Sequence, residues 1–143
     1  MKTILVLMVV VSLLVPISAN TQSTLALQEK CAEGGKKFFF ERIKLYGGSW
    51  GSFSDEKGHG YNHFTTHYNK KFDKCFIRIE YSYFPKDKDQ KIIKTIEIYN
   101  AFEGNHFAGW SLPILLNTDC KVGDKTCNSL SEFEALTKPY MEE

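Results

Sequence analysis

The residues best suited to chemistry in this sequence lie on one predicted sheet face. Stretches 61–69 and 74–84 alternate in polarity, and neighbouring side chains of a β-strand point to opposite faces. If their apolar residues point inward, polar side chains of these strands and of the next one share the outer face: His63, His67, Arg78, Glu80 and Glu97. A histidine, a carboxylate and an arginine are the base, acid and charge clamp of phosphodiester cleavage.

The same five residues also fit a solvated face that is held by cross-strand ion pairs. The alternative function that these residues suggest is a small secreted hydrolase. Its likeness to ribonucleases lies in the residue types alone. The sequence contains no Gly-x-Ser-x-Gly elbow, and no cysteine stays free if all four are paired, so nucleophilic catalysis has no candidate residue.

Three histidines spaced four residues apart, His59, His63 and His67, would form a metal-binding face on a helix. The glycines beside His59 and the aromatic and β-branched residues around the other two favour a strand instead. On a strand, residues i and i+4 lie about 13 Å apart, which is too far for two ligands to share one ion. We therefore predict solvent-facing histidines, no metal site and no cofactor.

Residues 1–19 have the composition of a secretory signal peptide. Lys2 precedes an apolar stretch at residues 4–17, and the small residues before position 20 predict cleavage after Ala19. A transmembrane helix needs roughly 20 apolar residues, so we expect no membrane anchor after cleavage. Residues 20–143 would then form one exported domain, periplasmic or secreted.

The charges of the chain are nearly balanced. The sequence has 18 basic and 17 acidic residues, a formal net charge of +1. Such a chain has no bulk attraction for nucleic acid or for an acidic membrane surface. We therefore expect no nucleic-acid partner. The sequence does not identify the partner, and an envelope or extracellular protein is one candidate.

Four cysteines in a short exported chain predict two disulfides, because oxidising compartments let such bonds persist. Cys120 and Cys127 flank a turn signal, which favours a bridge between them and leaves Cys31 to pair with Cys75. Cys75 also lies on the apolar face of stretch 74–84, where a covering helix would bring Cys31. A zinc site is the competing interpretation, and the lack of any Cys-x-x-Cys spacing disfavours it.

The expected fold is α+β, with an antiparallel sheet of about four strands in a single domain. Apolar residues recur at helical spacing over residues 25–46, and this N-terminal helix is expected to cover one sheet face. Strands are predicted after a glycine-rich loop, at residues 61–69, 74–84, 92–102 and 106–112. Ser129 and Glu132 fit a capping box that begins a short C-terminal helix, which Pro139 should end or kink.

The segment at residues 67–76, His-Tyr-Asn-Lys-Lys-Phe-Asp-Lys-Cys-Phe, resembles a recurring segment of small exported bacterial proteins without a characterised activity. In those proteins Leu-Asn usually stands where this chain has Phe72 and Asp73. The C-terminal stretch from Cys120 to Met141 is similar to the end of the same proteins. The resemblance implies a bacterial, exported setting, and it assigns no catalytic residue.

Together these features favour an exported binding or interaction domain that is not an enzyme, such as an inhibitor or an envelope-associated factor. Several aromatic residues could line a ligand groove or fill the core: Tyr81, Tyr83, Tyr99 and Trp110. The rival function is the small hydrolase. Convergence of the five polar side chains in a concavity would favour the hydrolase, and their spread over a flat face would exclude it.

Overall fold

The computed structural model describes residues 18–45, 51–113 and 120–142. The predicted signal segment lies outside the described residues, apart from the backbone of Ser18 and Ala19, which belongs to the first helix. Within the described ranges, no helix is both long enough and apolar enough to cross a membrane.

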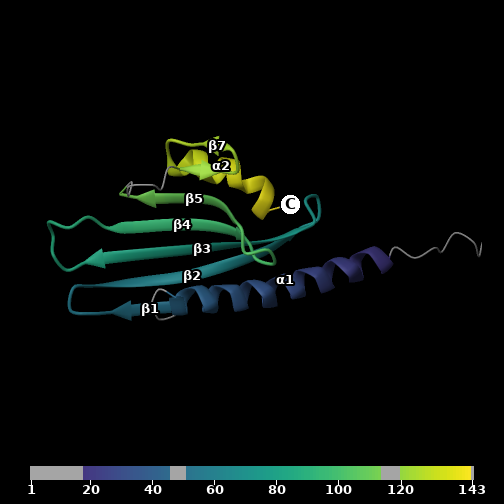
Figure 1. Ribbon diagram of the computed structural model, residues 1–143, viewed down its shortest axis with the longest axis horizontal. Helices are drawn as coiled ribbons and strands as arrows, with labels where there is room; N and C mark the ends of the chain where they lie inside the picture. The colour runs from purple at the N-terminus through teal and green to yellow at the C-terminus, as the bar shows by residue number, and fades with distance from the viewer. Residues whose placement is uncertain (1–17, 46–50, 114–119, 143) are drawn as a thin grey trace, which may run out of the picture.

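One antiparallel sheet of seven strands forms the centre of the molecule, and its spatial order follows the chain order (Figure 1). The strands are β1 (Gly51–Ser54), β2 (Gly58–Asn69), β3 (Lys74–Pro85), β4 (Ile93–Asn100), β5 (His106–Leu112), β6 (Lys121–Val122) and β7 (Lys125–Thr126). The α+β class is confirmed, whereas the prediction of about four strands is too low. The additional strands are short: β1 lies in the predicted glycine-rich loop, and β6 and β7 form a hairpin between Cys120 and Cys127.

Helices cover both faces of the sheet (Figure 1). The N-terminal helix α1 (Ser18–Leu45) begins earlier than the predicted start at residue 25, and α2 (Leu130–Met141) is the predicted C-terminal helix. Neighbouring residues of β3 point to opposite faces: Ile77 packs with Phe39 of α1, and Phe76 packs with Phe133 of α2. The sheet therefore has two partly buried faces rather than the single covered face that we expected.

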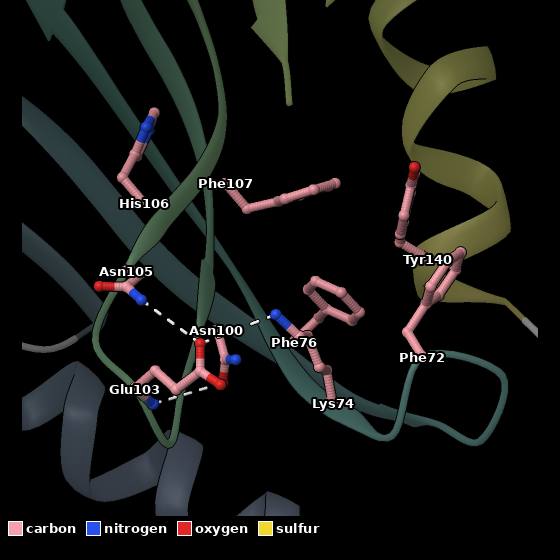
Figure 2. A pocket seen from close by; sticks show the side chains of 9 residues that line it. All are labelled: Phe72, Lys74, Phe76, Asn100, Glu103, Asn105, His106, Phe107 and Tyr140. Atoms are coloured by element: carbon pink, nitrogen blue, oxygen red, sulfur yellow. Dashed lines mark hydrogen bonds and ion pairs between the residues drawn. The ribbon is translucent and has the colours of Figure 1, made fainter. Parts of the chain in front are cut away.

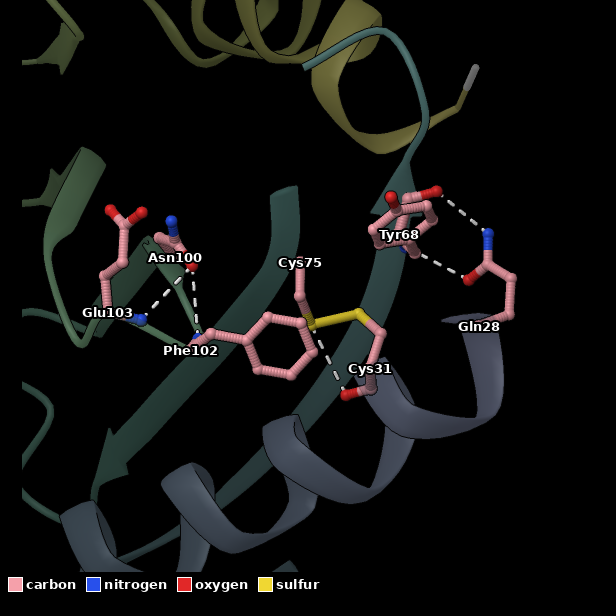
Figure 3. Close-up of a disulfide and its surroundings, with 7 residues drawn as sticks. All are labelled: Gln28, Cys31, Tyr68, Cys75, Asn100, Phe102 and Glu103. Atoms are coloured by element: carbon pink, nitrogen blue, oxygen red, sulfur yellow. Dashed lines mark hydrogen bonds between the residues drawn. A yellow bond between two sulfur atoms is a disulfide. The ribbon is translucent and has the colours of Figure 1, made fainter. Parts of the chain in front are cut away.

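Both predicted disulfides are present. The Cα atoms of Cys31 and Cys75 are 5.4 Å apart, and those of Cys120 and Cys127 are 4.9 Å apart. The first bond joins α1 to β3 in a buried cluster (Figure 3). Beside it, the Gln28 side chain donates to the carbonyl oxygen of Tyr68 and accepts from its backbone N–H, both at 3.0 Å. Gln28 thus makes the two hydrogen bonds that another strand would make at this edge of β2.

The close approach of α1 to the sheet depends on two glycines. A Cβ atom at Gly35 would lie 2.2 Å from Cγ2 of Thr66, and one at Gly34 would lie 2.8 Å from the Phe102 ring. Glycine destabilises a helix relative to alanine. The closer packing of α1 on the sheet offsets this cost.

The capping box at the start of α2 is confirmed, with one change of partner. Ser129 Oγ accepts from the backbone N–H of Glu132 at 3.2 Å, and the Glu132 carboxylate accepts from the N–H of Asn128 at 2.9 Å. The carboxylate therefore reaches one residue further back than in the usual box. Pro139 does not end the helix, which continues to Met141.

Candidate functional site: a polar sheet face and an aromatic pocket

Four of the five predicted site residues share the sheet face that α2 covers: His63, His67, Arg78 and Glu80. The strand register places His63 opposite Glu80, and His67 opposite Phe76, which belongs to the core beneath α2. His63 Nε2 lies 3.8 Å from Glu80 Oε1, and the same oxygen accepts from Arg78 Nε at 2.8 Å. His67 is half-buried.

Glu97 lies on the opposite face, so its predicted place beside Arg78 is wrong. The register pairs Glu97 with Ile79 and pairs Arg78 with Ile98. The prediction assumed that Ile98 faces α1, but Ile98 packs in the core beneath α2. The Glu97 carboxylate instead accepts from the Tyr99 hydroxyl at 2.8 Å, on the side of α1.

Arg78 is held by carboxylates on two sides within the fold. Its two terminal nitrogens donate to the Glu134 carboxylate of α2 at 2.8 and 2.7 Å, in addition to the Glu80 contact. Burial acts to lower the pKa of Arg78, but the hydrogen bonds that it donates to Glu134 and Glu80 outweigh burial and raise the pKa. Two carboxylates thus offset the guanidinium charge, and the pair with Glu134 joins α2 to the sheet.

We expect Arg78→Lys to loosen α2, because lysine lacks the planar fork that binds Glu134 through two hydrogen bonds. The predicted loss in the free energy of unfolding is about 1 to 2 kcal/mol, measured by urea denaturation. Lys138→Ala is the control, since it removes only an exposed ion pair with Glu142 and should cost less than about 0.5 kcal/mol. Equal losses for the two variants would contradict a structural role for the Arg78–Glu134 pair.

A cavity of about 320 Å³ opens at one end of the sheet, beside the last turn of α2 (Figure 2). Four aromatic side chains line it: Phe72, Phe76, Phe107 and Tyr140. The polar lining residues are Lys74, Asn100, Glu103, Asn105 and His106. We call this cavity the aromatic pocket. Its volume is at the lower end of the range of about 300 to 1,000 Å³ that ligand sites occupy.

The aromatic wall is held together by Tyr140. This ring stacks on Phe72 with a centroid distance of 4.8 Å and meets Phe107 at 4.6 Å and Phe76 at 5.6 Å. Tyr140 comes from α2, Phe72 comes from the β2–β3 hairpin, and the other two rings come from strands. The wall is therefore complete only when α2 is docked on the sheet.

Asn69, at the end of β2, fixes the hairpin against α2. Its Oδ1 atom accepts from the backbone N–H groups of Lys71 and Phe72 at 3.0 and 3.2 Å. Its Nδ2 atom donates to the carbonyl oxygens of Pro139 and Tyr140 at 2.9 and 3.3 Å. Asn69 is 0% exposed, so one buried side chain holds Phe72 and Tyr140 side by side.

The same hairpin has a second internal contact. Asp73 adopts a φ of 51°, in the left-handed region that aspartate tolerates better than most residues. Its carboxylate accepts a hydrogen bond from the Tyr68 hydroxyl. That hydrogen bond, followed by burial, raises the pKa of Tyr68. The turn that carries Phe72 is thus held from both ends.

The polar wall comes from the β4–β5 turn. Oδ1 of Asn100, the last residue of β4, accepts from the N–H groups of Phe102 and Glu103 at 3.1 and 3.4 Å. The Glu103 carboxylate accepts from Asn105 Nδ2 at 3.3 Å and lies 3.7 Å from Lys74 Nζ (Figure 2). The opposite charges of Lys74 and Glu103 offset each other, so this ion pair adds no net charge to the wall.

The aromatic pocket is not predictable from a local sequence pattern, because its lining comes from segments far apart in the chain. The four aromatic residues that we expected to line a groove are not among its lining residues, and one of them, Tyr99, is in the core with Phe39. A usable signal was present: an asparagine ends β2 and another ends β4, each followed by a turn that it closes.

Among the described residues, no three His, Cys, Asp or Glu side chains gather closely enough to hold a metal ion. No protein-family model, curated protein or solved structure matches the chain.

Proposed function

We propose that this chain is an exported binding domain and that the aromatic pocket is its ligand site. The supporting observation is an aromatic wall, held by Tyr140, that faces the Lys74–Glu103 side across a cavity of about 320 Å³. Ligand sites combine apolar walls with a few placed polar groups in this way. Ligand binding requires walls of this kind and no reactive side chain, so the arrangement fits a domain whose role is to bind a ligand.

Export is supported by the covalent structure. Two disulfides fit an oxidising compartment, and the signal-like composition of residues 1–19 points to the same destination. The domain would therefore meet its ligand in the periplasm or outside the cell.

Binding without catalysis is favoured over hydrolysis by the state of the polar sheet face. The guanidinium of Arg78 is already bound by Glu80 and Glu134, and Glu97 lies on the other side of the sheet. His63 still lies near Glu80, but the charge clamp that a phosphodiester requires is engaged.

The proposal is tested by NMR mapping of the oxidised, ¹⁵N-labelled protein with a set of small uncharged ring compounds as probes. We expect several compounds to shift the amide signals of Phe72, Phe107 and Tyr140. In the Phe72→Leu variant, the same compounds should bind several-fold more weakly. The signal of Tyr61, on the open part of the sheet, is the internal control. If no compound shifts the pocket signals, or if the shifts gather around Tyr61, the proposed site is wrong.

A further inference from the structure

We infer that the aromatic pocket binds a neutral oligosaccharide; this inference rests on the proposed binding function and names its ligand class. A sugar ring carries apolar C–H groups on its faces and hydroxyl groups around its edge, and each hydroxyl both donates and accepts. The pocket offers the matching pair of walls, with rings on one side and amide, carboxylate and ammonium groups on the other (Figure 2).

The charge of the polar wall favours a ligand without net charge. Lys74 Nζ lies 3.7 Å from the Glu103 carboxylate, so a strongly anionic or cationic ligand would gain from one group and lose to the other. A hydroxyl group can accept from the ammonium and donate to the carboxylate without disturbing the pair.

The angles between the rings disfavour a flat aromatic ligand. The Phe76 and Phe107 planes are 54° apart, and Tyr140 makes angles of 60° with Phe107 and 71° with Phe76. The nearly parallel pair, Phe72 and Tyr140 at 23°, stacks on itself at 4.8 Å and leaves no slot between the rings. Tilted rings cannot sandwich a planar heterocycle, but they can contact the C–H groups of a puckered ring, which point in several directions.

Asn100 supplies a hydrogen-bond donor that the fold leaves unused. The residue is 5% exposed, and its Oδ1 atom is occupied by the turn. Its Nδ2 atom donates no hydrogen bond to any described residue, and it points to the side of the Glu103 carboxylate (Figure 3). This nitrogen is not fully buried, and Asn100 lines the aromatic pocket, so it is free to donate to a ligand oxygen there.

A second cavity extends the site beyond one sugar ring. Its volume is about 270 Å³, and it shares His106 and Phe107 with the aromatic pocket. Lys121 and Asp124 add one charge of each sign to its lining, so it is balanced like the first. Two adjoining cavities with balanced charges fit consecutive units of a neutral chain. An extended peptide would instead need backbone partners along a strand edge, and the aromatic pocket lies at the end of the sheet.

The test is an NMR titration of the oxidised protein with chitotriose, cellotriose and maltotriose, and with trigalacturonate as the anionic comparison. We expect at least one neutral trisaccharide to saturate the pocket signals, and trigalacturonate to bind at least tenfold more weakly. Asn100→Asp keeps the turn acceptor and removes the amide donor, so the neutral ligand should bind roughly tenfold more weakly. Phe72→Leu is the second variant; Phe72 is 37% exposed, so the fold should tolerate the loss of its ring.

Tyr61→Ala is the matched control, because Tyr61 is a 39% exposed aromatic residue outside the pocket. Unchanged affinity in this variant, with weaker binding in the two pocket variants, supports the inference. Failure of every neutral trisaccharide to shift the pocket signals overturns the inference of a sugar ligand. If uncharged ring compounds still bind in the aromatic pocket, the proposed binding function stands without it. Loss of sugar binding in Tyr61→Ala alone would overturn the location.

Discussion

Replacing both Cys31 and Cys75 with alanine is expected to lower the free energy of unfolding by about 4 kcal/mol. The bond closes a loop of 44 residues, and the entropy that a crosslink removes from the unfolded chain increases with loop length. Both sulfurs are fully buried between α1 and β3. Guanidinium denaturation of the oxidised protein and of the double variant measures the difference.

The second disulfide provides the matched comparison. Cys120 and Cys127 are separated by 7 residues, and the same relation gives about 2.4 kcal/mol for this shorter loop. The paired Cys120→Ala and Cys127→Ala variant should therefore lose clearly less stability than the first. An equal or larger loss from the short bridge would contradict the account in which the longer loop gives the Cys31–Cys75 bond the larger stabilisation.

Asn69→Ala is expected to lower the free energy of unfolding by about 2 to 4 kcal/mol. The substitution leaves two turn N–H groups and two carbonyl groups of α2 without their buried partner. It also releases the hairpin from α2, so Phe72 and Tyr140 should separate and ligand binding in the aromatic pocket should be lost. Urea denaturation measures the first effect, and NMR titration in the refolded variant measures the second.

Asn105→Ala is the control for Asn69→Ala. Asn105 is also an asparagine of the pocket lining, but it is exposed, and its side chain makes a single hydrogen bond, at 3.3 Å to Glu103. Its replacement should change the free energy of unfolding by less than about 0.5 kcal/mol. If Asn69→Ala were as mild as this control and kept the ligand shifts, the buried amide would not be what joins the two walls.

The features that the sequence predicted are those with a strong local pattern or a covalent constraint. Strand β3 follows from its alternation, and the pairing of Cys31 with Cys75 follows from placing the apolar face of that strand against a helix. Ser129 and Glu132 marked the start of α2 because capping acts within one turn. Each of these patterns lies within a short stretch of chain.

The features that the sequence did not predict depend on contacts between distant segments. Strands β6 and β7 have two residues each, which is too short for any periodicity. Strand β4 is partly buried on both faces, so alternation alone could not tell which face Glu97 takes. Segment 67–76 and the C-terminal tail were singled out by resemblance, but only the fold brings Phe72 beside Tyr140.

The place of a bound ligand is tested most directly by intermolecular NOEs in the complex with the tightest-binding neutral trisaccharide. We predict cross-peaks from sugar ring protons to the aromatic protons of Phe72 and Tyr140. Cross-peaks to Tyr61 and His63 with none to Tyr140 would place the ligand on the open sheet face and contradict the aromatic pocket as the binding site.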